Sequence, residues 1–95
     1  MKVTTTTGAT FEVNDNAFRD YRTVRAYSAV LNTKRADEER LNCACELVRC
    51  VMRDDEEAFI SSFEENGYID TEKVLAETLR IMEILRGASE ETKKP

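Results

Sequence analysis

The chain of 95 residues contains no histidine, no tryptophan, one proline and three glycines. Without histidine, it lacks the side chain that most often acts as a general base or zinc ligand near neutral pH. It also has no apolar run long enough for a secretory signal or a transmembrane helix, so we expect a cytoplasmic protein without a membrane partner. The length predicts one domain, near the lower end of sizes that bury a core without disulfides.

Charge is abundant and unevenly distributed. Residues 1–35 hold six basic and three acidic side chains, whereas residues 36–95 hold eight basic and sixteen acidic ones. Such an asymmetry can steer the chain toward a complementary partner, including another copy of itself, or can simply solvate helical surfaces. Six basic residues on an acidic chain make a weak phosphate footprint, so nucleic acid is not an expected partner.

The first residues predict a β-hairpin over about residues 2–14. The stretch KVTTTTGATFEV alternates, is rich in β-branched residues and places Gly8 where a tight turn needs it. Val3, Phe11 and Val13 would share the inward face only if the loop has an odd number of residues, which leaves the register open. An isolated hairpin is marginal in water, so it must pack on helices or offer its edge to another strand.

Helical patterns fill the rest and predict a mostly α chain with a small N-terminal hairpin (α+β). We expect a compact bundle of about four helices within a single domain of residues 1–87. The expected helices cover about residues 16–32, 36–53, 55–65 and 71–86. Residues 88–95 carry no apolar stripe and are expected to form a disordered tail.

Two sides of the first predicted helix carry different residue types. Arg19, Arg22 and Arg25 follow one another at spacings of three, either as a solvated face or as a contact for an acidic partner. Another side comprises Ala17, Tyr21, Val24, Ser28 and Leu31, flanked by Phe18 and Tyr27.

The last predicted helix has one apolar stripe and one polar face. Gly87 is expected to end this helix, which begins at Asp70 or Thr71. The residues expected to face away from the core are Lys73, Glu77, Arg80 and Glu83.

All three cysteines lie within the stretch LNCACELVRC, residues 41–50. On a helical wheel Cys50 returns to within about 20° of Cys43, whereas Cys45 lies about 160° away, so three thiolates on one helix cannot converge on a metal ion. Cys43 and Cys50 also lie about 10 Å apart along the axis, too far for a disulfide. Helix packing is the favoured interpretation, with thiol chemistry or metal binding as the alternative, and no cofactor is expected.

The same helix is apolar over more than half of its circumference. This predicts either the central helix of the domain or a helix that lends a flank to a partner. We therefore take Cys43, Leu47 and Cys50, with Ile81 and Leu85 of the last helix, as candidate partner-binding residues beside the three arginines. The broad stripe comprises Leu41, Ala44, Cys45, Val48, Val51 and Met52.

The sequence supplies no recognisable active site. There is no glycine-rich phosphate loop, and Cys43 has Arg40 and Arg49 nearby but no general base. The acidic runs 54–57 and 64–65 lack the alternating ligand spacing of a calcium-binding EF-hand loop and fit helix caps better. We therefore expect a non-enzymatic interaction protein.

Two stretches resemble the tail assembly chaperones of long-tailed bacteriophages. ATFEVNDNAFRDYRTVRAYSAV is similar to the family's strand, acidic cap and aromatic-containing first helix, and EENGYIDTEKVLAETLRIMEIL to its acidic-glycine turn and final amphipathic helix. The resemblance covers roughly residues 8–86 by the pattern of elements rather than by an invariant motif. The cysteine-bearing middle helix has no typical counterpart in the family.

The resemblance implies a phage or prophage protein of virion assembly that acts in the host bacterial cytoplasm and is absent from the finished particle. Its implied partners are the tape measure protein, which it would keep soluble, and the tail tube protein, whose subunits it would help recruit. The unpaired hairpin edge and the charge asymmetry are compatible with a homo-oligomer.

The alternative function is that of a small acidic regulatory or inhibitor protein acting by protein–protein binding. Its helices could pass for a DNA-binding helix-turn-helix. The last helix, however, carries acidic residues in equal number to its basic ones, which would repel phosphates.

Overall fold

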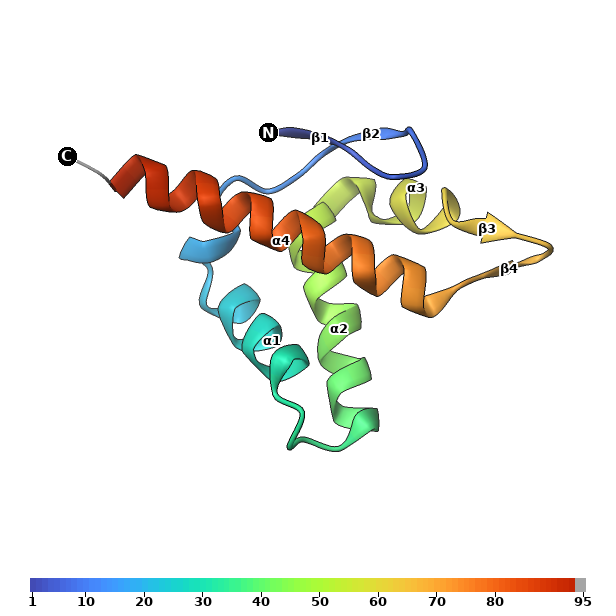
Figure 1. The fold of residues 1–95 in the computed structure, drawn as a ribbon, viewed down its shortest axis with the longest axis horizontal. Helices are drawn as coiled ribbons and strands as arrows, with labels where there is room; N and C mark the ends of the chain where they lie inside the picture. Colours follow the sequence, from blue (N-terminus) through green and yellow to red (C-terminus); the bar gives the residue numbers. More distant parts are fainter. Residues whose placement is uncertain (94–95) are drawn as a thin grey trace.

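The computed structural model describes residues 1–93, with side-chain detail for residues 1–88. It confirms a mostly helical chain with a small N-terminal hairpin (Figure 1). Its elements are β1 (Lys2–Thr4), β2 (Thr10–Glu12), a 3-10 turn (Ala17–Arg19), α1 (Tyr21–Leu31), α2 (Asp37–Met52), a second 3-10 turn (Arg53–Asp55), α3 (Glu56–Ser61), β3 (Glu64–Glu65), β4 (Tyr68–Ile69) and α4 (Thr71–Lys93).

The expected bundle of about four helices is corrected to three long helices and one short one within the described residues. α1, α2 and α4 have 11, 16 and 23 residues, whereas α3 has only six. α4 crosses the molecule, with α1 and α2 side by side on one side of it and the β1–β2 hairpin on the other (Figure 1). The hydrophobic core lies where these elements meet.

The N-terminal hairpin has the register that buries its apolar residues. Val3 pairs directly with Phe11, and both are buried together with Val13. Residues 5–9 form the loop, so its length is odd, as the shared inward face requires. The hairpin is held on the helices partly by aromatic contact, since the ring of Phe11 meets that of Phe59 edge-on at 5.7 Å.

Side chains from the helices occupy both outer edges of this hairpin. The guanidinium of Arg80 donates to the Thr4 carbonyl at 2.9 Å, on the β1 edge. The carboxylate of Asp55 accepts from the Glu12 backbone N–H at 3.0 Å, on the β2 edge. These contacts limit the room for strand addition, because an added strand needs such backbone groups for its own hydrogen bonds.

The first predicted helix is split at Asp20. That residue has an extended backbone (φ −92°, ψ 117°), and its carboxylate accepts from the Arg22 backbone N–H at 2.9 Å, which caps α1. The break changes the phase of the helix relative to Ala17. The buried residues of α1 are Thr23, Ala26, Tyr27, Ala29 and Val30.

The side of α1 that carries Tyr21, Val24 and Leu31 faces solvent to a large extent. Tyr21 is 74% exposed and Leu31 is 52% exposed, and Val24 also reaches solvent. Ala26 and Ala29 face the interior, as does Tyr27, which the sequence placed at the flank of that side.

Polar contacts fix α1 against its neighbours. The Tyr27 hydroxyl donates to the Glu83 carboxylate of α4 at 2.6 Å. The Arg40 guanidinium donates twice to the Val30 carbonyl, at 3.1 and 2.9 Å, and so satisfies a backbone acceptor in the last turn of α1. α1 is thereby tied to both long helices.

The segment between α3 and α4 is a short hairpin rather than helix. The expected helix to residue 65 ends at Ser61, and Asn66 and Gly67 adopt positive φ values of 55° and 87° between β3 and β4. Adjacent positive φ values suit an Asn-Gly hairpin loop, which explains why the chain reverses at these two residues.

α4 continues beyond its expected end at Gly87 as far as Lys93. Gly87 does not adopt the positive φ of a C-terminal helix cap. The expected disordered tail is thus helical over residues 88–93, and its last two residues lie outside the described part of the chain.

Candidate partner-binding groove

An apolar groove of about 330 Å³ lies among α2, α3, β4 and the start of α4. We call it the α2–α4 groove. Residues far apart in the sequence form it, because α3 and the β3–β4 hairpin bring the chain back toward α2 (Figure 1). Its lining comprises Leu41, Cys45, Val48, Arg49, Glu56, Ile60, Ile69, Thr71, Val74 and Leu75.

The floor and walls of the groove differ in exposure. Val48 and Val74 are buried at its floor, where they also belong to the hydrophobic core. Leu41 and Ile69 stand on its walls and remain exposed, Leu41 at 45%. When a complementary apolar group covers apolar surface that is open to water, the free energy falls by about 25 cal/mol for each Å² buried. The groove can therefore bind apolar side chains.

One ion pair and one thiol supply polarity within the lining. The guanidinium of Arg49 lies 3.8 Å from the carboxylate of Glu56, across the gap between α2 and α3. Cys45 is exposed, and its thiol is free. Neither feature closes the groove, so its apolar walls stay accessible.

The three candidate arginines lie on or before α1 and do not line this groove. Arg22 pairs with Asp20 at 3.4 Å, and Arg25 pairs with Glu46 of α2 at 3.6 Å. The Arg25 guanidinium also lies 5.8 Å from the centre of the Tyr21 ring. Arg19 is exposed in the preceding turn.

The candidate partner-binding residues on α2 and α4 are buried or half-buried and do not line the groove. Leu47, Ile81 and Leu85 are buried in the core, which corrects the expectation that they contact a partner. Cys43 and Cys50 are half-buried, and Cys43 packs against the core. Of the three cysteines, Cys45 is the one that lines the groove. The i, i+4, i+7 stripe Leu41–Cys45–Val48 was the sequence signal for this wall, whereas the walls from α3 and β4 had none.

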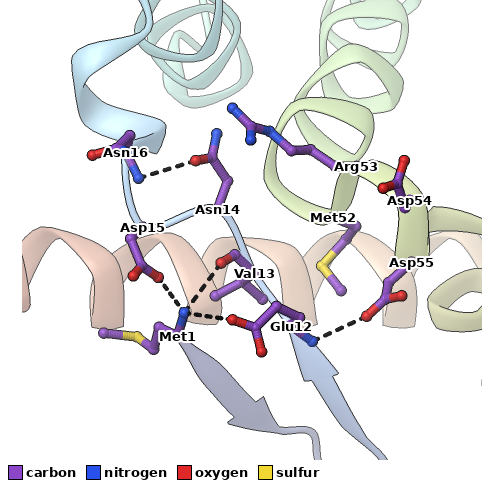
Figure 2. Close-up of a pocket in the computed structure, with 10 residues that line it drawn as sticks. All are labelled: Met1, Glu12, Val13, Asn14, Asp15, Asn16, Met52, Arg53, Asp54 and Asp55. Atoms are coloured by element: carbon purple, nitrogen blue, oxygen red, sulfur yellow. Dashed lines mark hydrogen bonds and ion pairs between the residues drawn. The ribbon is translucent and has the colours of Figure 1, made fainter.

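A second cavity, of about 420 Å³, lies between the hairpin and the end of α2 (Figure 2). Several of its polar groups are hydrogen-bonded to one another. The Met1 ammonium bonds to Asp15 and Glu12, and these hydrogen bonds raise the pKa of that amine. Asn14 donates from its side chain to the Cys50 carbonyl at 3.3 Å. These contacts tie the hairpin to the helices.

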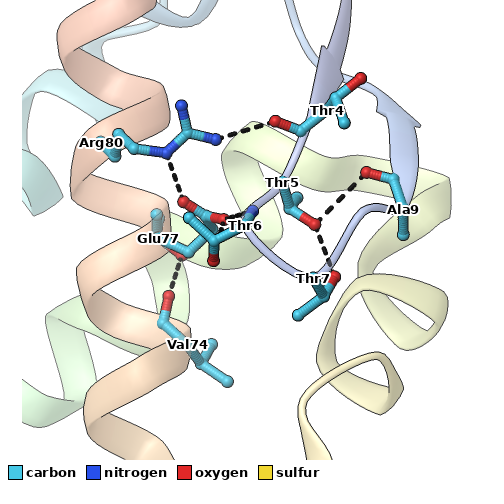
Figure 3. Close-up of polar contacts among 9 residues, drawn as sticks. Thr4, Thr5, Thr6, Thr7, Ala9, Val74, Glu77 and Arg80 are labelled. Carbon is cyan, nitrogen blue, oxygen red and sulfur yellow. Dashed lines mark hydrogen bonds and ion pairs between the residues drawn. The ribbon is translucent and has the colours of Figure 1, made fainter.

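A third cavity, of about 450 Å³, is lined by residues of the hairpin loop and of α4, which are joined by the polar contacts drawn in Figure 3. Glu77 was expected to face solvent but is only 4% exposed. Its Oε1 accepts from the backbone N–H and the hydroxyl of Thr6, and its Oε2 accepts from Arg80. Burial raises the pKa of Glu77, but the hydrogen bonds from Arg80 and Thr6 outweigh it and hold that pKa below its usual value. This network fastens the hairpin loop to α4.

Comparison of the chain with protein-family models, curated proteins and solved structures finds no match in any of the three. Each helix within residues 1–93 is too short or too polar to cross a lipid bilayer. The geometry and chemistry of the α2–α4 groove therefore carry the functional interpretation.

Proposed function

We propose that the chain is a non-catalytic binding protein whose α2–α4 groove covers the apolar face of a helical segment in a partner protein. The observation that carries this proposal is an open groove whose lining combines exposed Leu41 and Ile69 with the buried valines Val48 and Val74. Helices that dock in grooves insert apolar anchors spaced one turn apart, and walls built from α2 and α4 suit such anchors.

The resemblance to phage tail assembly chaperones makes the tape measure protein the proposed partner. A long helical protein with exposed apolar stripes aggregates unless those stripes are covered. The groove would cover one such stripe, while the acidic outer surface of the chain would keep the complex soluble. Recruitment of tail tube subunits would follow once the tape measure is held in an extended, soluble form.

The test is co-expression with the tape measure protein encoded in the same genome. Leu41→Asp places a charge on the groove wall, and Leu31→Asp is its matched control, because Leu31 is 52% exposed against 45% for Leu41 and lies outside the groove. We expect wild type and Leu31→Asp to co-purify with soluble tape measure and Leu41→Asp to lose it. Circular dichroism spectra are compared with that of the wild type to check that both variants fold.

Two outcomes contradict the proposal. The first is a tape measure that stays insoluble beside the wild-type chain. The second is an equal loss of binding in Leu31→Asp and Leu41→Asp, because the groove would then have no special role.

A further inference from the structure

The α2–α4 groove is apolar inside but acidic at its rim. Glu56 belongs to its lining. Glu64 is the cross-strand partner of Ile69, so its side chain lies on the same face of the small hairpin as that groove residue. Glu72 lies one helical turn before Leu75, and on α2 Glu38 lies one turn before Leu41, so both flank the walls.

Few cations offset these carboxylates. Among the residues whose side chains the structure describes, Arg49 is the one basic residue in the groove lining, and it is already paired with Glu56. Lys73 pairs at 3.1 Å with Glu65, whose side chain lies on the opposite face of the small hairpin from Glu64. The rim therefore carries a net negative charge around an apolar interior.

We infer that the segment bound in this groove is an amphipathic helix whose apolar anchors are flanked by lysine or arginine. The inference rests on the proposed function and specifies the partner segment further, as a helix with basic residues beside its apolar anchors. Basic flanks would meet the rim carboxylates at the edge of the contact, where they speed encounter and fix the orientation of the helix. Acidic flanks would face like charges there, so the groove discriminates against them.

The test uses two fluorescein-labelled synthetic helices with the same leucine anchors, one flanked by lysines and the other by glutamates. Fluorescence anisotropy measures their affinity for the full chain at 0.1 M and 1 M NaCl. We expect the lysine peptide to bind at least about tenfold more tightly at 0.1 M. Most of this preference is expected to disappear at 1 M, where the screening length falls from about 10 Å to about 3 Å.

Two double variants separate the rim from the overall charge. Glu64→Gln/Glu72→Gln removes two rim carboxylates, and Glu39→Gln/Asp54→Asn removes two exposed carboxylates that neither line the groove nor lie one helical turn before a groove residue. Both variants have the same net charge. We expect the preference for the lysine peptide to fall at least about threefold in the rim variant and to stay unchanged in the control.

The possible failures are distinguishable. Equal or tighter binding of the glutamate peptide, abolished by Leu41→Asp, would leave the groove as a binding site and overturn the inference about charge. If neither peptide binds, or if Leu41→Asp leaves lysine-peptide binding unchanged, both the inference and the groove assignment fail. The rim inference is also overturned if Glu39→Gln/Asp54→Asn reduces the preference as much as Glu64→Gln/Glu72→Gln does.

Discussion

The backbone N–H and the hydroxyl of Thr6 both donate to Oε1 of Glu77, although the two residues are 71 positions apart in the sequence. Arg80 bonds to the other oxygen of the same carboxylate and reaches the Thr4 carbonyl (Figure 3). A buried carboxylate held by three donors is stabilised only while it stays ionised. The attachment of the hairpin to α4 therefore depends on Glu77 staying ionised.

Glu77→Gln should lower the free energy of unfolding at pH 7 by about 2 kcal/mol, because the hydrogen bonds lose their charged acceptor. The folded-state pKa of Glu77 lies below its ordinary value. Its ionised form therefore stabilises the fold fully above the ordinary glutamate pKa, about 4.3, and that contribution is lost as the pH falls through the lower folded-state pKa. Urea denaturation should show a smaller difference in free energy of unfolding between wild type and Glu77→Gln at pH 3 than at pH 7.

Glu57→Gln serves as the control for Glu77→Gln, since Glu57 is an exposed carboxylate on α3. It should change stability by no more than about 0.5 kcal/mol at either pH. A gap for Glu77→Gln that is the same at pH 7 and pH 3 would contradict the role given to its ionised form.

Local patterns predicted the elements that depend on local chemistry. The hairpin was predicted with its turn near Gly8, and its register, which the sequence left open, buries Val3, Phe11 and Val13 together. The broad apolar stripe on α2 predicted either a central helix or a helix that lends a flank to a partner, and the structure buries Leu47, Val48 and Val51 in the core. These features follow from periodicity and turn chemistry, which operate over a few residues.

Tertiary contacts decided what the patterns missed. Glu77 lies on the polar face of α4, and only the arrival of the hairpin loop from the far end of the chain buries it. The wall that Ile69 gives to the α2–α4 groove depends likewise on the turn at Asn66 and Gly67. A periodicity count on a single helix contains no information about such distant partners.

Thr23→Val is expected to stabilise the chain by about 1 kcal/mol. The Thr23 side chain is fully buried, and its hydroxyl has no hydrogen-bond partner among the described residues. A helical threonine usually bonds to a carbonyl one turn earlier, but the turn before Thr23 is interrupted at Asp20. Valine replaces the unpaired hydroxyl with a methyl group of similar size, which removes the penalty of burying an unsatisfied donor.

Thermal unfolding of Thr23→Val should be compared with that of Thr78→Val. Thr78 is also buried, but its hydroxyl donates to the Val74 carbonyl at 2.8 Å. Its replacement therefore gives up a hydrogen bond and should bring no comparable gain. A similar rise in Tm for both variants would show that valine helps for reasons other than the unpaired hydroxyl.

Changing Cys43 and Cys50 together to serine should lower stability and leave the groove functional. Both side chains are half-buried, and neither lines the α2–α4 groove. Serine places hydroxyl groups where weakly polar thiols pack, at a cost of about 1 kcal/mol for each site. Urea denaturation measures the loss of stability. The folded double variant, at urea concentrations below its unfolding midpoint, should still bind the lysine-flanked peptide. A stable double variant that no longer binds would instead place the partner surface at these two residues.

Cys45 should be the first thiol to react with a maleimide in the folded chain. It is exposed on the groove wall, whereas Cys43 and Cys50 are half-buried. Limited labelling followed by peptide mass mapping identifies the modified residue. A bulky adduct on Cys45 should also obstruct the α2–α4 groove and abolish binding of the lysine-flanked peptide. Cys45→Ser should bind that peptide both before and after brief maleimide treatment, because its groove carries no reactive thiol. Labelling of Cys43 or Cys50 at the same rate, or full peptide binding by the Cys45 adduct, would contradict this placement of the groove.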